Sequence, residues 1–102
     1  MFPPLRLLVI TIEGVLLDVA GIHWVKAELA DGMGIGIWPG HVPLLAETVS
    51  ASLRYADSRG EHSMALGEGI LHVENGKVTV YTVPTSFLEA TDVLAGDDGS
   101  SR

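Results

Sequence analysis

Short apolar runs bounded by turn residues recur along most of the chain. Residues 5–11 form a run of Leu, Val and Ile with apolar positions on both faces, which is typical of a buried strand. Residues 15–20 and 22–29 are predicted to be two further strands, separated by Gly21. These runs are rich in β-branched residues, which favour extended backbone. This part of the chain is therefore predicted to be β-structure.

The clearest alternation of apolar and polar positions lies in residues 48–55. One face is apolar from Val49 to Tyr55, whereas the other carries Thr, Ser and Arg, which predicts one half-buried strand. Turn residues follow at 57–60, and a second alternating run occupies residues 61–66. The two runs are predicted to pair as a hairpin.

A second hairpin is predicted around Asn75 and Gly76. Both residue types tolerate positive φ, which a two-residue type I′ turn requires at both of its central positions. Residues 70–74 and 77–83 flank this dipeptide and are predicted to be its two strands.

The spacing of these signals predicts the fold class. Turn residues recur every eight to twelve residues, and no long helical period is present, which together favour an all-β antiparallel sandwich or barrel. Residues 1–94 are predicted to form one domain, in which only residues 86–94 could form a helical turn or two. Residues 95–102 are predicted to be a disordered tail.

Composition excludes several classes of protein. The chain has 102 residues, of which 47% are hydrophobic and 19% charged, so we expect a packed globule rather than a disordered chain. The net charge of −7 disfavours binding to nucleic acid or to anionic lipid. The longest apolar run, residues 7–10, is much shorter than the ~20 residues of a membrane-spanning helix.

Cysteine is absent from the chain, which excludes disulfides, a thiolate nucleophile and Cys-ligated zinc. The first residues lack the basic segment, apolar stretch and cleavage site of a signal peptide. We therefore predict a mature chain in the cytosol.

Candidate catalytic and ligand-binding groups form no recognisable site in the sequence. The histidines have none of the spacings typical of metal ligands; they are His23, His41, His62 and His72. Gly32, Gly34 and Gly36 form Gly-x-Gly-x-Gly, but Pro39 stands where a dinucleotide-binding loop needs its third glycine. No serine lies in a Gly-x-Ser-x-Gly elbow. We therefore predict no catalytic residue, no metal and no cofactor.

One segment carries a more specific signal. From Gly34 to Leu45 it reads Gly-Ile-Gly-Ile-Trp-Pro-Gly-His-Val-Pro-Leu-Leu. It closely resembles the Gly-Ile-aromatic/Leu-Pro-Gly-His-x-Pro-Leu-Leu signature of the epsilon subunit of rotary F-type ATP synthases, a family that includes the mitochondrial delta subunit. Residues 7–16 resemble the opening strand and Glu-Gly turn of that family, and residues 67–73 and 77–80 resemble two later strands.

The resemblance implies a fold and a function. The implied fold is a flattened antiparallel β-sandwich of about ten short strands, in agreement with the alternation of apolar positions. The implied function is that of a non-catalytic rotor subunit in the central stalk, which binds the gamma subunit and the c-ring and couples ion-driven rotation to ATP synthesis. For a bacterial source it would lie at the cytoplasmic face of the membrane.

In that family the loop with the Pro-Gly-His motif faces the polar loops of the c-ring. The resemblance therefore assigns a partner-binding site to this loop, with Trp38 and Ile37 as apolar anchors; its residues are Gly36, Ile37, Trp38, Pro39, Gly40, His41 and Pro43. His41 is expected at the exposed tip, where it can contact the c-ring, hydrogen-bond its own loop, or do both.

The chain also departs from the family pattern. The acidic residue often found before the Gly-Ile pair is missing, and Glu68 splits the usual Gly-Gly pair. The family usually continues beyond the sandwich as a helical hairpin that can inhibit ATP hydrolysis, whereas this chain stops at Arg102. Either the subunit is naturally short, or the chain was cut to its amino-terminal domain.

An alternative function belongs to a different class. A stand-alone β-sandwich could act as a binding or adaptor module, using the loop between Asp31 and His41 to contact another partner. The stalk hypothesis predicts an apolar sheet face that stays exposed in the isolated chain, and the mean hydropathy of +0.35 agrees with it. A uniformly polar surface would favour the adaptor.

Overall fold

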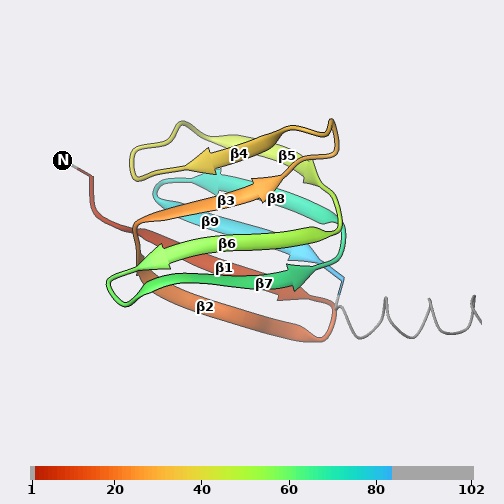
Figure 1. Cartoon of the computed structure of the whole chain (residues 1–102), viewed down its shortest axis with the longest axis horizontal. Helices are drawn as coiled ribbons and strands as arrows, with labels where there is room; N and C mark the ends of the chain where they lie inside the picture. Colours follow the sequence, from red (N-terminus) through yellow and green to blue (C-terminus); the bar gives the residue numbers. More distant parts are fainter. Residues whose placement is uncertain (1, 84–102) are drawn as a thin grey trace, which may run out of the picture.

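The computed structural model describes residues 2–83, which form strands joined by turns and short loops (Figure 1). The strands are β1 (Leu5–Thr11), β2 (Gly14–Ile22), β3 (Trp24–Glu28), β4 (Gly34–Ile37), β5 (Leu44–Thr48), β6 (Ala51–Asp57), β7 (Gly60–Leu66), β8 (Gly69–Glu74) and β9 (Lys77–Thr82). Within this range there is no helix that could cross a membrane. The helical turn predicted for residues 86–94 and the tail predicted for residues 95–102 lie outside the described residues.

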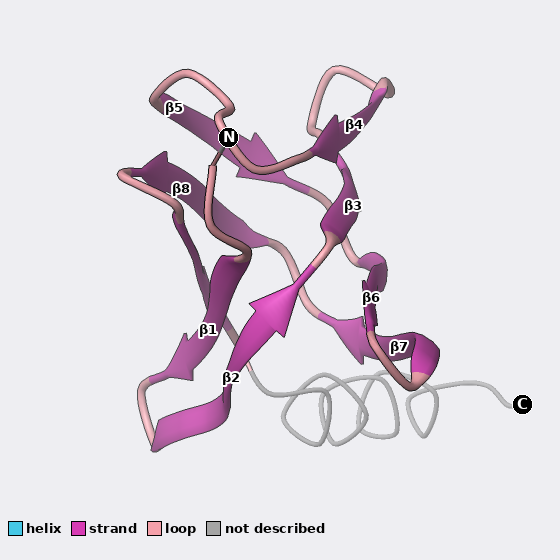
Figure 2. Ribbon diagram, turned by 90° about the vertical axis from the view of Figure 1, so that its left-hand side faces the viewer, coloured by secondary structure: helices cyan, strands magenta, loops and turns pink. Residues whose placement is uncertain are grey.

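The strands form two sheets that pack face to face as a sandwich. The five-stranded sheet has the order β2-β1-β9-β8-β5, and the four-stranded sheet has the order β4-β3-β6-β7. Figure 2 shows the two layers from the side. The predicted all-β sandwich is confirmed, with nine strands in the described part. All strand pairs are antiparallel except β1 and β9, which run parallel in the middle of the larger sheet.

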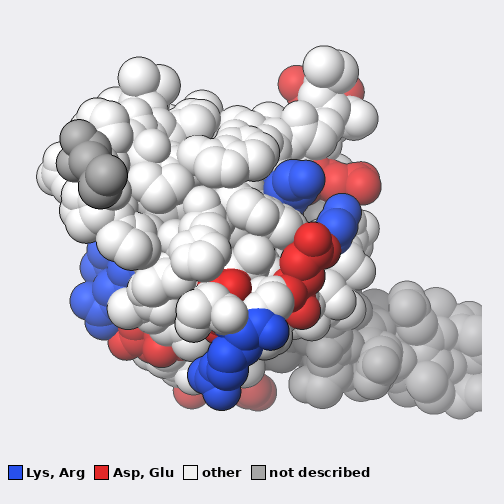
Figure 3. All heavy atoms as spheres, turned by 60° about the vertical axis from the view of Figure 1, so that its left-hand side comes forward, with Lys and Arg blue, Asp and Glu red and all other residues white. Residues whose placement is uncertain are grey.

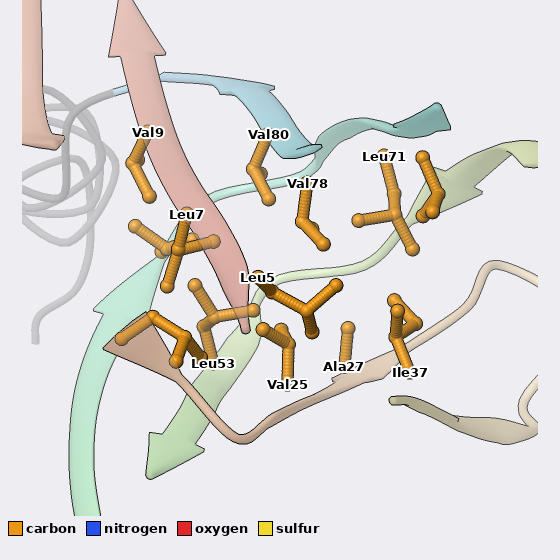
Figure 4. Close-up of a cluster of buried hydrophobic side chains, with 13 residues drawn as sticks. Leu5, Leu7, Val9, Val25, Ala27, Ile37, Leu53, Leu71, Val78 and Val80 are labelled. Atoms are coloured by element: carbon orange, nitrogen blue, oxygen red, sulfur yellow. The ribbon is translucent and has the colours of Figure 1, made fainter. Parts of the chain in front are cut away.

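The core lies between the two sheets and consists of aliphatic side chains from both layers (Figure 4). Leu7, Val78 and Leu71 are fully buried from the five-stranded sheet, and Val25 and Ile37 from the four-stranded sheet. Burying one such side chain stabilises the fold by about 1.5–3 kcal/mol. With no disulfide available, this packing holds the sandwich together.

Both predicted hairpins are confirmed. Asn75 and Gly76 have φ values of 53° and 75°, and Glu74 pairs with Lys77, as a two-residue turn with positive φ at both positions requires. In the β6–β7 hairpin Asp57 pairs with Gly60.

The prediction of one strand over residues 48–55 was wrong. β5 ends at Thr48 and belongs to the five-stranded sheet, whereas β6 begins at Ala51 and belongs to the four-stranded sheet. The chain crosses from one layer to the other at residues 49–50, where the backbone N–H of Val49 donates to the carbonyl of Glu28 over 3.2 Å. The alternation of apolar and polar residues continues through the crossing and therefore hides it.

Gly21 does not separate two strands as predicted. β2 continues through it to Ile22, and the pairing with β1 shifts register between Leu5 and Leu7. Gly21 adopts a φ of 71° at this irregularity, a conformation that suits glycine. The break falls at His23, whose backbone N–H donates to the carbonyl of Ala56 over 2.7 Å as the chain enters the other sheet.

Candidate partner-binding surfaces

The predicted site begins where β4 ends and the chain makes a tight turn. The backbone N–H of His41 donates to the carbonyl of Trp38 over 3.0 Å, which closes a four-residue turn. Pro39 fixes its own φ, and Gly40 has a φ of 87°. Proline followed by a residue with positive φ is the sequence that a type II turn favours, so the Pro-Gly pair of the motif has a direct conformational role.

His41 bonds to its own loop and still offers one nitrogen to a partner. Its Nδ1 lies 2.8 Å from the carbonyl oxygen of Val42, and a carbonyl only accepts, so Nδ1 must donate. In the neutral imidazole this leaves Nε2 as an acceptor. The structure therefore supports the expected hydrogen bond within the loop and remains compatible with a partner contact.

The turn lies at one end of the sandwich, next to the amino-terminal residues. Gly40 lies against the ring of Phe2. The approach is so close that a Cβ at this position would come 2.5 Å from a ring carbon. A hollow of about 400 Å³ is lined by Phe2, His41, Pro43 and the turn at Gly76. Gly40, His41 and Pro43 are thus brought together at this end.

Ile37 does not have the role expected of it. Its side chain is fully buried in the core, so it offers no surface to a partner in this structure. It fixes the loop to the core from inside the sandwich. Trp38 is half exposed, and its indole lies over Gly36, where a Cβ would overlap the ring. Of the two expected anchors, only Trp38 is available for contact.

Trp38 faces a different part of the molecule from His41. It lines a depression with Lys26 of β3 and Arg54 of β6 on the outer face of the four-stranded sheet, and both of these cations also contact Trp24 of β3. The Lys26 ammonium lies 4.7 Å from the ring centroid of Trp24 and 6.0 Å from that of Trp38, and the Arg54 guanidinium lies 5.9 Å from Trp24. We call these four side chains the cation–aromatic surface.

Trp24, Lys26 and Arg54 were not among the predicted site residues. The spacing of Trp24 and Lys26 does indicate part of this surface, because side chains two residues apart in a strand share a face. The strand pairing then places Lys26 beside Gly36 on one side and beside Arg54 on the other. Only the pairing, which the sequence does not give, brings these groups together.

The outer face of the five-stranded sheet is apolar at one end of its strands, whereas Arg6, Lys77 and Glu74 form a charged row at the other end. Paired residues of adjacent strands share a face, and one such row crosses the sheet through Val15, Ile10, Tyr81 and Ile70. Leu45 of β5 points to the same side beside His72 and is 70% exposed, while Tyr81 is 48% exposed. We call these five apolar side chains the apolar face; they are Ile10, Val15, Leu45, Ile70 and Tyr81.

The apolar face is continuous with the loop. A shallow hollow of about 420 Å³ is lined by Pro43, Leu45, His72 and Tyr81. Pro43 therefore adjoins both the apolar face and the end of the sandwich that carries His41. Elsewhere on the surface basic and acidic side chains lie side by side, beneath a broad area free of charge (Figure 3).

Two hydrogen-bonded pairs of side chains link neighbouring strands. The guanidinium of Arg6 donates twice to Asp18, over 2.9 and 2.8 Å, and this bonding lowers the pKa of the carboxyl. Asp57 accepts from His62 over 3.0 Å and from the backbone N–H of Arg59 over 2.8 Å. These hydrogen bonds lower the pKa of Asp57, with the larger effect from His62.

The remaining candidate groups are spread over the fold. Gly32 has a φ of 87° in the turn before β4, whereas Gly34 and Gly36 lie within that strand, so the three glycines do not form one loop. Among residues 2–83 there is no group of three or more His, Asp or Glu side chains placed to hold a metal ion.

The fold is that of a β-sandwich domain with a row of exposed apolar side chains on its larger sheet. The chain belongs to the family described as ATP synthase, Delta/Epsilon chain, beta-sandwich domain, whose model matches residues 4–84. A curated relative, the ATP synthase epsilon chain of Lawsonia intracellularis (strain PHE/MN1-00), is 31% identical over 68 residues. That match covers 67% of this chain, which spans about half (51%) of the relative's length.

Solved structures share the fold. A chain of the Euglena gracilis mitochondrial ATP synthase, from a structure of OSCP/F1/c-ring in rotational state 1, is similar with a TM-score of 0.74 and 16% identity, over 100% of this chain and 71% of that one. A chain from the central stalk/cring structure of the Tetrahymena thermophila mitochondrial ATP synthase has a TM-score of 0.65 and 10% identity, over 81% and 66% of the two chains.

Proposed function

We propose that this chain is a rotor subunit of the central stalk of an F-type ATP synthase, where it joins the gamma subunit to the c-ring without catalysing a reaction itself. Family membership supports this role, as does the fold shared with chains of two ATP synthase assemblies. The observation that carries the proposal is the exposed apolar face, because a domain that works alone has little reason to leave such a row in water.

The gamma subunit is proposed to cover the apolar face. Interfaces that stay assembled are rich in buried apolar and aromatic side chains, and Tyr81 lies in the middle of this row with Ile70 and Ile10 on its two sides. The strand that carries Tyr81, β9, is paired with a neighbour on both sides, so its side chains are held in place before binding.

The end of the sandwich with Gly40, His41 and Pro43 is proposed to meet the polar loops of the c-ring. A type II turn fixes the backbone here, and Nε2 of His41 can accept a hydrogen bond from a ring side chain. Because Pro43 adjoins the apolar face, one contiguous surface would contact both gamma and the ring. In a bacterial source this arrangement would lie at the cytoplasmic face of the membrane, held there through the complex.

Reconstitution tests this proposal. The gamma subunit, the c-ring and this chain, all from one source, are assembled, and the amount of chain retained on the ring after washing is measured. We expect retention of the natural sequence and weaker retention of His41→Ala. Trp38→Ala should be retained like the natural sequence, because its indole lies on the outer face of the four-stranded sheet. Arg59→Ala, in the exposed β6–β7 turn, is the matched control.

The outcomes separate the parts of the proposal. Equal retention of His41→Ala and the control would remove the loop from the ring contact. Failure of the natural sequence to bind gamma or the ring would overturn the stalk role and favour the adaptor module.

A further inference from the structure

We propose that the cation–aromatic surface is a second docking surface, which binds an acidic peptide segment of a protein partner. It consists of Trp24, Lys26, Trp38 and Arg54, on the outer face of the four-stranded sheet. The proposal does not depend on the stalk function, because the apolar face lies on the other sheet and the two surfaces can be occupied together.

Two cations lie opposite each other on this surface. Lys26 and Arg54 are direct cross-strand neighbours, an arrangement that is unfavourable for like charges. The Lys26 ammonium lies over two indole rings, those of Trp24 and Trp38. Arg54 pairs with Glu61 over 3.1 Å, but both side chains are more than half exposed, and such pairs contribute little. A carboxylate from a partner placed between the two cations would relieve their repulsion.

These cations lie in a chain whose net charge is −7. The chain has six Lys and Arg against thirteen Asp and Glu, so a general attraction for acidic ligands is absent. Any affinity for an acidic segment must therefore come from a local group of basic side chains.

The shape of the surface favours a peptide over a small ion. A depression of about 320 Å³ lies along β3 and β4, and its lining includes Gly34, Gly36 and Ser52, which have small side chains or none. Glu28 also lines it, beside Gly34 and two residues along β3 from Lys26, so the acidic segment is expected to lie at the Lys26 end. The indole of Trp38 packs against Gly36, so this half-exposed side chain is already in place before binding. Fixed, half-exposed indoles are frequent anchors of protein interfaces. An extended segment could place a carboxylate at the cations and an apolar side chain against Trp38.

Tryptophan fluorescence provides a direct test, because the only two tryptophans of the chain, Trp24 and Trp38, both belong to this surface. The full chain is titrated with a short acetylated peptide of glutamate and leucine, and with a second peptide in which lysine replaces glutamate. The variants are Lys26→Gln and Arg54→Gln. Lys77→Gln removes the same charge from an exposed position at the start of β9, in the other sheet, and is the matched control. Circular dichroism confirms that each variant is folded.

We expect a saturable change in emission with the acidic peptide and none with the basic one. Lys26→Gln and Arg54→Gln should each weaken the apparent affinity about tenfold, because a charge-assisted hydrogen bond is lost, while Lys77→Gln leaves it unchanged. Since each variant removes one cation, either one alone suffices if the other does not fold.

Three results would overturn the proposal. The first is no saturable change at millimolar acidic peptide, and the second is an equal loss of affinity in Lys77→Gln. The third is that the chain's own carboxylates hold the surface: replacing Asp97 and Asp98 by Asn would then change the emission of the free protein and raise its affinity for the peptide.

Discussion

The two outer faces of this sandwich differ although the inner faces are alike. Both sheets contribute fully buried aliphatic side chains to one core. Outside, the five-stranded sheet presents the apolar face, whereas the four-stranded sheet presents the cation–aromatic surface. Inner positions are thus determined by packing, and outer positions are free to carry the chemistry of partners.

The residues of the predicted partner-binding loop are also divided between different parts of the molecule. Within a few residues the chain places Ile37 in the core, Trp38 over the four-stranded sheet and His41 at the end of the sandwich. One continuous motif therefore serves packing and two separate surfaces.

The largest effect on stability is expected from glycine replacement in the five-stranded sheet. A Cβ at Gly69 would overlap the backbone carbonyl of Tyr81, which cannot move without breaking the sheet. Gly69→Ala should therefore lower the free energy of unfolding by about 3 kcal/mol in urea denaturation. Gly34→Ala is the matched control in β4, because the nearest atom would be 3.8 Å away. Equal stability of the two variants would show that the contact at Gly69 is relieved without cost.

Binding of the gamma subunit should distinguish the two outer faces. Tyr81→Ser and Ile70→Ser remove large exposed side chains from the apolar face, so their free energies of unfolding should change little. If Tyr81 is central to the interface, its replacement should weaken binding about thirtyfold, as is typical of interface anchors. Lys26→Gln, on the other face, should leave the affinity for gamma unchanged. Isothermal titration calorimetry measures all three, and the reverse order of effects would assign gamma to the four-stranded sheet.

A smaller change should follow from Gly36→Ala. The new methyl group would displace the far end of the Trp38 ring, which is half exposed and can swing away. We expect a loss of about 1 kcal/mol or less in stability and a red shift of tryptophan emission, since Trp38 enters water. Gly34→Ala again serves as the control and should leave the emission unchanged. No shift in Gly36→Ala would mean that Trp38 is not held on Gly36.

The smallest effect concerns acid stability. Because its hydrogen bonds lower the pKa of Asp57 below the ordinary 3.8, the folded state favours the ionised carboxylate and the unfolded state binds more protons. The contribution of Asp57 is therefore fully present above its unfolded pKa and is lost as pH falls through its folded value. In Asp57→Asn the free energy of unfolding should therefore fall less steeply as the pH is lowered. Urea denaturation at a series of pH values from neutral downwards measures this dependence.

Glu47→Gln removes an exposed carboxylate from β5 and is the control for charge alone. If its free energy of unfolding becomes as insensitive to acid as that of Asp57→Asn, the hydrogen bond from His62 has no specific effect.

Local conformation could be predicted well from the sequence. The turn at Asn75 and Gly76 was predictable because positive φ at both positions restricts which residues fit. The crossing between layers at residues 49–50 was not, because alternation reports which side is buried and not which sheet a strand joins.

The candidate site was only partly predictable, for a related reason. Gly40 and His41 could be placed by the turn that Pro39 and Gly40 favour. The burial of Ile37 and the contact of Lys26 with two indoles depend on strand pairing, which brings distant parts of the chain together.

Native mass spectrometry of this chain mixed with the gamma subunit from the same source tests the central claim most directly. The stalk role predicts a stable one-to-one complex for the natural sequence, and a much smaller fraction of complex for Tyr81→Ser under the same conditions. Two folded proteins that form no complex would contradict it, and the chain would then be a member of this family with a different partner.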